Sequence, residues 1–185
     1  MAHRSSIAGL LVMPAALLAP HVASAQSTAT IDQSGDANVA TVVQDGPDKK
    51  LLAAMTGSAS TLNARQTGVA SAELSLLSSG SGNAVDLLQS GAPGAANLAV
   101  LSQNGTHNYA TIEQVAASGA ANTISLVQDG NDNDATLYQE GAGNDLDVTQ
   151  QGDANLAAIS QIGNALGLDI TQDGGAAITV TQTGF

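Results

Sequence analysis

The sequence predicts an all-β fold, a two-sheet β-solenoid of about seven strand-turn-strand rungs with cross-β, amyloid-like stacking. Three observations predict it: a Gln-x-Gly motif that recurs along the chain, alternation of apolar and polar residues before each motif, and a scarcity of aromatic side chains. Hydrophobic residues make up 43% of the 185 residues, whereas aromatic residues make up only 2%. Because a conventional core relies on large side chains, this composition favours a thin interior.

The first 25 residues are predicted to be a secretory signal peptide, outside the fold. His3 and Arg4 form a short basic start, residues 7–18 are mostly apolar, and Ala23-Ser24-Ala25 has the pattern of a cleavage site. Residues 26–185 are therefore expected to form one exported repeat domain with no transmembrane segment.

The Gln-x-Gly motif has two levels of spacing. The interval from Gln33 to Gln44 is 11 residues, and the alternate intervals that follow keep this value as far as the one from Gln150 to Gln161. The other intervals vary, reaching 14 residues between Gln89 and Gln103. One connection therefore has a fixed length and the other tolerates insertions, which predicts seven units of two segments each. Met55 and Ser78 stand at two of the glutamine positions.

Within each segment, residues alternate in polarity. The residues two and four positions before each Gln are apolar and the sixth is often Asn, as in Asn108, Ala110, Ile112 and Gln114. A period of two indicates a strand whose Asn, apolar and Gln side chains face inward. A Gly stands two residues after each Gln of the repeat except Gln114, and it is typical of a turn that needs positive φ. The predicted turn glycines are Gly35, Gly46, Gly68, Gly91, Gly105, Gly130, Gly141, Gly152, Gly163 and Gly174.

Stacked rungs would pair the inward amides. A buried unpaired amide costs about 1–3 kcal/mol, and identical amides one rung apart can hydrogen-bond to each other along the axis. One uninterrupted ladder is predicted from Gln44, Gln66, Gln89, Gln114, Gln139, Gln161 and Gln182. A second, interrupted at Met55 and Ser78, is predicted from Gln33, Gln103, Gln128, Gln150 and Gln172. The predicted inward asparagines are Asn38, Asn83, Asn97, Asn108, Asn122, Asn133, Asn144 and Asn155.

Composition excludes several classes of function. The chain has 16 Asp and Glu against four Lys and Arg, and neither cation occurs after Arg65, so nucleic-acid binding is excluded. Without Cys there is no disulfide or thiolate metal site. No catalytic motif is present, so we expect no enzyme activity, no cofactor and no metal site.

Acidic residues raise one further question. Asp129, Asn131, Asn133 and Glu140 have a spacing similar to that of a calcium loop, although the repeat already explains them, and calcium binding at acidic positions stays open. Outward carboxylates are expected to slow premature aggregation.

The repeat resembles the curlin repeat of curli amyloid fibre subunits from bacterial biofilms. The whole pattern is matched by Ser27, Gln33, Gly35, Asn38, Ala40 and Gln44, and most of it again from Gln103, Gln128 and Gln150 onward. The resemblance implies a secreted structural subunit that polymerises into an extracellular cell-surface fibre, or fimbrium, and supports biofilm matrix and adhesion. It implies three partners: further copies of the chain, a nucleator subunit and an outer-membrane secretion pore.

Two alternatives remain. The chain could be the minor nucleator subunit of the same fibre, although nucleators tend towards a basic final repeat and this one has no Lys or Arg. It could also be a monomeric secreted β-solenoid that binds a ligand.

Overall fold

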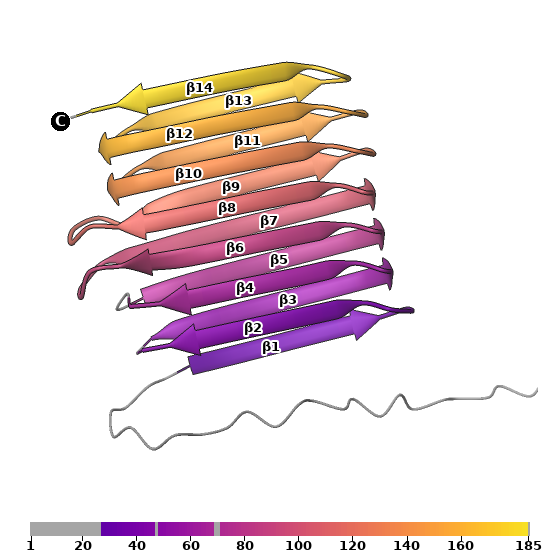
Figure 1. The fold of residues 1–185 in the computed structure, drawn as a ribbon, viewed down its shortest axis with the longest axis horizontal. Helices are drawn as coiled ribbons and strands as arrows, with labels where there is room; N and C mark the ends of the chain where they lie inside the picture. The colour runs from indigo at the N-terminus through magenta and orange to yellow at the C-terminus, as the bar shows by residue number, and fades with distance from the viewer. Residues whose placement is uncertain (1–26, 47, 69–70, 185) are drawn as a thin grey trace, which may run out of the picture.

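The computed structural model describes residues 27–46, 48–68 and 71–184 (Figure 1). The predicted signal peptide lies outside the described residues. None of the described segments is a helix long and apolar enough to cross a membrane.

The chain forms two seven-stranded parallel sheets, which confirms the predicted two-sheet β-solenoid (Figure 1). Sheet A contains β1 (Ser27–Ser34), β3 (Lys49–Ser58), β5 (Ser71–Ser81), β7 (Ala96–Thr106), β9 (Asn122–Asp129), β11 (Asp145–Gln151) and β13 (Gly167–Asp173). Sheet B contains β2 (Val39–Asp45), β4 (Thr61–Thr67), β6 (Ala84–Gly91), β8 (Tyr109–Ala116), β10 (Asp134–Ala142), β12 (Leu156–Asn164) and β14 (Ala177–Thr183). Each rung is one strand of sheet A and the next strand of sheet B, and rungs are numbered 1 to 7 from the N-terminus.

Equivalent positions of successive rungs are stacked in register. In sheet B, Gln44 pairs with Gln66, which pairs with Gln89. In sheet A, Gln128 lies between Gln103 and Gln150. A slip of one residue would turn every inward side chain outward, so the period-two pattern fixes this register.

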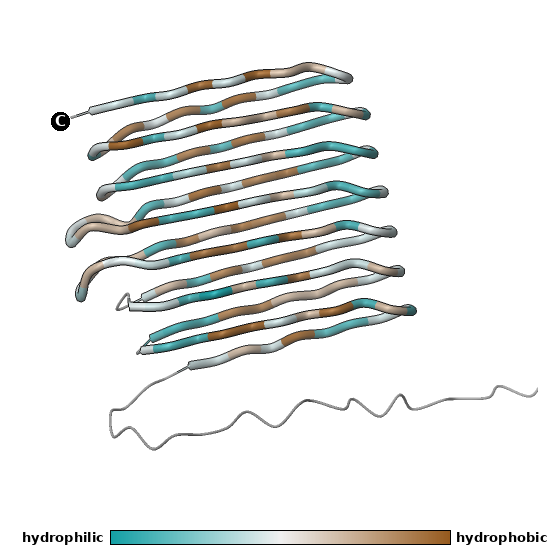
Figure 2. Tube along the Cα trace, in the orientation of Figure 1, coloured by the Kyte–Doolittle hydropathy of each residue, from teal (hydrophilic) through white to brown (hydrophobic). Residues whose placement is uncertain are grey.

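Most of the interior is one apolar cluster between the sheets, and Ala72, Ala95 and Ala116 form a second, smaller cluster. Leu51, Leu74, Ile124 and Leu146 are fully buried within the larger cluster, and the alternation along each strand is visible in Figure 2. The interior is more open at its ends: Ile31, on β1, is 38% exposed because none of the described rungs lies beneath it. Burial of the apolar face therefore depends on neighbouring rungs.

The arcs within each rung bring glycine backbones of successive rungs close together. Gly105 has φ of 114°, and a Cβ atom there would overlap the carbonyl oxygen of Gly130 on the next rung. Glycine is therefore required both by the backbone conformation and by the distance between rungs. Nine of the ten predicted turn glycines have positive φ.

Gly91 is the exception, and the prediction of a positive-φ turn there is wrong. Gly91 is the last residue of β6, and the turn lies after it, where Ala95 N donates to Ala92 O at 3.0 Å and Gly94 has φ of 79°. The inserted Pro93-Gly94 pair explains the displacement, because Pro and Gly suit the two central positions of a type II turn.

A second left-handed position in the arcs was not predicted. It lies two residues after the arc glycine, and its φ is 59° at Ala37, 55° at Ala59, 56° at His107 and 60° at Ala154. Alanine carries no sequence signal for this conformation, so only the geometry of the arc reveals it.

Gly105→Ala should lower the free energy of unfolding of the monomer by about 2 kcal/mol or more, since it adds backbone strain and a clash with the next rung. Gly167→Ala is the matched control, because Gly167 lies outside the left-handed region and nothing is within 4 Å of its added Cβ. Urea unfolding of freshly purified monomer measures both changes. Equal stability of the two variants would contradict this account of the arc.

Candidate self-assembly site

The glutamines of sheet B form a continuous ladder of hydrogen bonds. Each Nε2 donates to the Oε1 of the glutamine one rung towards the C-terminus, at distances from 2.7 Å (Gln66 to Gln89) to 3.0 Å (Gln114 to Gln139). The ladder begins with Gln44 donating to Gln66 and ends with Gln161 donating to Gln182, both at 2.8 Å. All these amides therefore point the same way along the axis.

The same amides join the two sheets. Besides its ladder bond, Gln139 Nε2 donates to Thr123 O at 2.9 Å, and Gln150 Nε2 donates to Asp134 O at 3.0 Å. In both cases the carbonyl belongs to a strand of the opposite sheet. The buried glutamines, from Gln66 to Gln172, thus each donate at least two hydrogen bonds from Nε2 in a nearly water-free interior, where such bonds are strong.

The ladder of sheet A is shorter and has the predicted interruption. Gln103, Gln128, Gln150 and Gln172 are joined by bonds of 2.9 Å. Below them, Ser78 Oγ and Gln103 Oε1 are both buried without a hydrogen-bond partner, because the serine is too short to reach the glutamine.

The inward asparagines bond differently from the predicted amide-to-amide ladder. Asn108 Nδ2 donates to Gly130 O at 2.9 Å, and Asn108 Oδ1 accepts Asn133 N at 3.2 Å. The partners are mainly backbone groups of the next rung, because Asn is one methylene shorter than Gln and its amide lies beside the arc. Direct amide contacts occur from Asn133 to Asn108 at 3.1 Å and from Asn155 to Asn133 at 2.9 Å.

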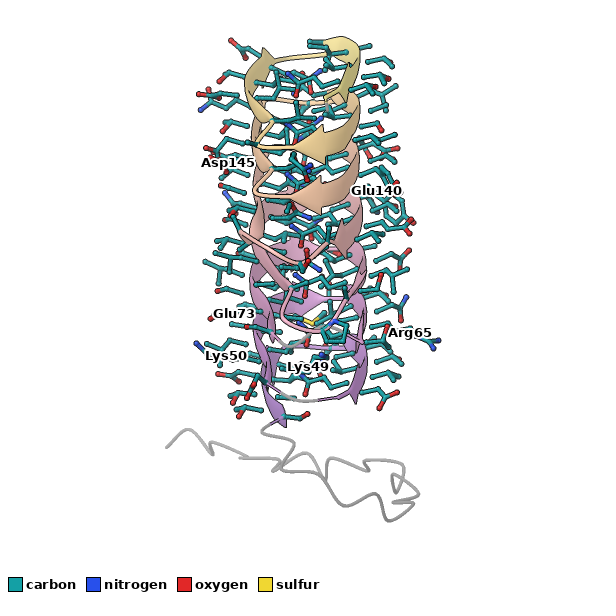
Figure 3. The ribbon with its side chains drawn as sticks, turned by 90° about the vertical axis from the view of Figure 1, so that its left-hand side faces the viewer. Lys49, Lys50, Arg65, Glu73, Glu140 and Asp145 are labelled. Atoms are coloured by element: carbon teal, nitrogen blue, oxygen red, sulfur yellow. The ribbon has the colours of Figure 1, made fainter. Side chains whose placement is uncertain are left out.

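Lys49 occupies one of the inward positions near the start of β3. It is 1% exposed and is in register with Ala72, which pairs with Asn97. Burial lowers the pKa of Lys49, and the carboxylates of Asp45 and Asp48 oppose this effect. Sequence reasoning did not identify this buried cation, because Lys49 and Lys50 are adjacent and only the register decides which faces inward (Figure 3).

The calcium-like spacing does not form a site. Asp129 is exposed, whereas the Asn133 side chain is fully buried and bonds to Gly152 O at 2.9 Å. Among the residues that the structure describes, no group of three or more His, Cys, Asp or Glu could hold a metal ion.

The two ends of the solenoid expose complementary edges. β1 and β2 at one end, and β13 and β14 at the other, each pair with a strand on one side only. The ladder direction leaves Gln44 Oε1 at the first rung and Gln182 Nε2 at the last. Over 27–46, 48–68 and 71–184, no helix or loop covers either end.

This geometry defines a class of protein, a parallel two-sheet β-solenoid built on stacked amides with open ends. The curlin associated repeat family matches residues 26–48, 94–130, 119–152 and 141–174. The chain therefore belongs to the curlin associated repeat family, a structural repeat family, and no enzymatic domain is identified in it. No curated protein and no solved structure matches the chain significantly.

Gln114→Ala should lower the free energy of unfolding of the monomer by about 1–3 kcal/mol, because it leaves the amides of Gln89 and Gln139 without their ladder partner. Gln151→Ala is the control, because Gln151 is exposed and lies outside the ladder. Its stability should stay within about 0.5 kcal/mol of the parent. Similar losses in both variants, measured by urea unfolding, would argue against the ladder as a source of stability.

Asp134 is a half-buried carboxylate at the start of β10. Its Oδ1 is buried without a hydrogen-bond partner, and burial raises the pKa of Asp134. A carboxyl whose pKa is higher in the folded state holds its proton more tightly there. Its contribution to the free energy of unfolding therefore rises as pH falls from the folded pKa towards the unfolded value, about 3.9.

Asp134→Asn should therefore stabilise the monomer at pH 7, with an advantage over the parent that shrinks as pH is lowered towards about 4. Asp145→Asn, at an exposed position of sheet A, controls for the loss of one negative charge. Urea unfolding of the three proteins across this pH range is the measurement. An advantage of Asp134→Asn that grows on acidification would show that the sign is wrong.

Proposed function

We propose that residues 26–185 form a secreted, self-assembling structural subunit of a curli-like amyloid fibre on the bacterial cell surface. The observation that carries this proposal is the pair of open ends, which display the same strand register and opposite ends of one amide ladder. Such a surface joins copies head to tail and produces an open filament rather than a closed ring. Membership of the curlin associated repeat family supports the proposal.

If the strand register continues across the junction between two copies, equivalent residues of the two end rungs lie opposite each other. With rung 7 of one copy stacked on rung 1 of the next, Gln182 lies opposite Gln44 and Gln172 opposite Gln33. Val180 lies opposite Val42. One N–H of Gln182 Nε2 donates to Gly167 O at 3.3 Å, and the other then meets the Oε1 of Gln44, so the ladder of sheet B continues from one subunit into the next.

The charges of the end rungs also suit this junction. In the same register, Asp169 lies opposite Thr30 of the next copy and Asp173 opposite Ser34. Asp32 and Asp45 of that copy face Thr171 and Thr183. No carboxylate is therefore stacked on another across the junction, and register slips that would place Asp169 on Asp32 are disfavoured.

The other outward carboxylates slow assembly. Within the chain, Asp147 and Asp169 are register partners on the outer face of sheet A, and Asp145 lies beside them. Repulsion between the acidic C-terminal rungs of separate copies slows their encounter before export is complete.

The remaining roles follow from the family. A nucleator subunit and an outer-membrane secretion pore are the proposed partners, and adhesion and matrix formation the proposed roles of the fibre. We favour the main subunit over the nucleator because the final repeat contains no Lys or Arg.

The test is assembly of purified residues 26–185, followed by amyloid dye binding and sedimentation. The parent should form fibres with a meridional reflection near 4.8 Å. Val180→Asp should slow elongation by roughly tenfold or more, because it places a carboxylate in the apolar part of the junction. Thr179→Asp is the matched control, with the same charge on the outer face of β14, and should elongate at a rate close to the parent.

Each alternative has its own outcome. Persistent monomer from the parent chain overturns self-assembly and favours a monomeric binding protein. Acceleration of another subunit's assembly without growth of its own fibres indicates a nucleator. Equal rates for Val180→Asp and Thr179→Asp would place the junction elsewhere.

A further inference from the structure

The outer face of sheet A carries an apolar patch that no described residue covers. Four large side chains project from it, and their exposed fractions are 38% for Leu52, 55% for Leu77, 43% for Val100 and 37% for Val127. They come from rungs 2 to 5, one from each rung. We call these four residues and the small residues beside them the sheet A patch.

Large and small residues alternate in a checkerboard within the patch. Each rung contributes two outward residues at its centre, and one of the two is always Ala or Ser. The pairs are Leu52 with Ala54, Ser75 with Leu77, Val100 with Ser102, and Ser125 with Val127. The large residue changes sides from one rung to the next, because Leu52 and Ser75 are register partners, as are Ser75 and Val100.

The small residues leave a hollow at the N-terminal end of the patch. A shallow depression of about 290 Å³ is lined by Leu52, Ala54, Ser75 and Leu77 of the patch and, on rung 1, by Thr30 and Asp32. A protruding Leu side chain from a facing sheet can occupy such a depression, as in the dry, interdigitated interfaces of paired amyloid sheets.

We propose that the sheet A patch pairs two fibres side by side, face to face, with a second copy of this chain as its occupant. The proposal rests on the proposed function, since it requires the fibre. The patch spans four rungs of about 4.8 Å and offers roughly 300 Å² per copy, well below the ~800 Å² per partner of a stable interface. Single subunits therefore do not pair, whereas fibres present the patch once per subunit and pair through many copies at once.

The geometry selects a two-fold axis parallel to the fibre. With this axis, each rung of one fibre faces the same rung of the other fibre, and the facing strands run in opposite directions. The first of the two central outward residues of a rung therefore faces the second one of its partner. Leu52 then faces Ala54, Leu77 faces Ser75, and Val100 faces Ser102. Every large residue of the patch enters a position held by a small one.

Charge complementarity supports the same arrangement. The acids of sheet A would face neutral partners: Glu73 faces Ser79, Asp147 faces Thr149, and Asp169 faces Thr171. An antiparallel pairing centred on the patch also matches large to small residues. In a continuous fibre, however, it sets Asp169 against Asp169 of the opposing copy, and we therefore exclude it.

Sheet B is not suited to the same contact. Its outer face carries Arg65, Asp86 and Glu113 near its centre, where Asp86 accepts bonds from Asn63 at 2.8 Å and Tyr109 at 2.7 Å. Under the same symmetry Asp134 would face Glu140. Figure 3 shows Arg65 and Glu140 on the side opposite Lys50, Glu73 and Asp145. Pairing through sheet A leaves this charged face in water.

The test compares fibres of residues 26–185 carrying Leu77→Asp with fibres carrying Leu88→Asp. Leu88 is the matched control, because it occupies the equivalent outward position of the same rung on sheet B. Mass per unit length from electron microscopy should show two filaments per fibre in the parent and in Leu88→Asp. Leu77→Asp should give single filaments, with half the mass per length and an elongation rate within about twofold of the parent.

The possible results distinguish failure of lateral pairing from failure of fibre formation. Single filaments in the parent, or paired filaments in Leu77→Asp, overturn lateral pairing through sheet A while leaving end-to-end assembly intact. Absence of fibres from the parent overturns the proposed function and lateral pairing with it. If Leu77→Asp alone fails to polymerise, Val100→Asp supplies the same readout, and paired filaments in that variant overturn the proposal.

Discussion

The whole structure depends on the pairing of inward amides between rungs. A glutamine in an apolar interior is costly unless its N–H and C=O groups are all bonded, and in the ladder the Oε1 of each glutamine is bonded by the glutamine of the neighbouring rung. Gln114, for example, accepts from Gln89 and donates to Gln139, and it also bonds to Leu98 O across the interior. The amides therefore fix the distance between rungs, the register of the strands and the separation of the sheets together. The arcs must keep the same distance between rungs as the amide ladders, and only glycine allows their backbones to approach that closely.

The same constraint explains why the ends of the solenoid favour assembly. Within the solenoid, each rung bonds the amides and covers the apolar side chains of the rungs on both sides. The first and last rungs have a neighbour on one side only. Their apolar side chains are half-buried and their ladder groups are free to bond another copy. Stability within a subunit and growth of a fibre are thus products of one interaction. The outward residues have a different role, because they are free to vary in charge and size without disturbing the ladders, and so can determine how fibres repel or contact one another.

Much of the fold could be predicted from particular residues. The spacing of Gln44, Gln66 and Gln89 predicted the rungs, and the alternation before each glutamine predicted which side chains face inward. Other features were not predictable. Asn108 bonds to the backbone because of its length and position beside the arc, and Gly91 is not a turn glycine because Pro93-Gly94 forms the turn instead. Lys49 is buried in spite of its charge because the register places it inward.

The sequence by itself determined the all-β class, the number of rungs, the inward positions and the interrupted ladder, because a period of two and a repeat spacing are local properties of the chain. Only the tertiary structure decided the direction of the amide bonds, the left-handed residues of the arcs and the unpaired Oε1 of Gln103. The same holds for the checkerboard of Leu52, Leu77, Val100 and Val127. These features arise between residues more than 20 positions apart, which become neighbours only once the rungs are stacked in register.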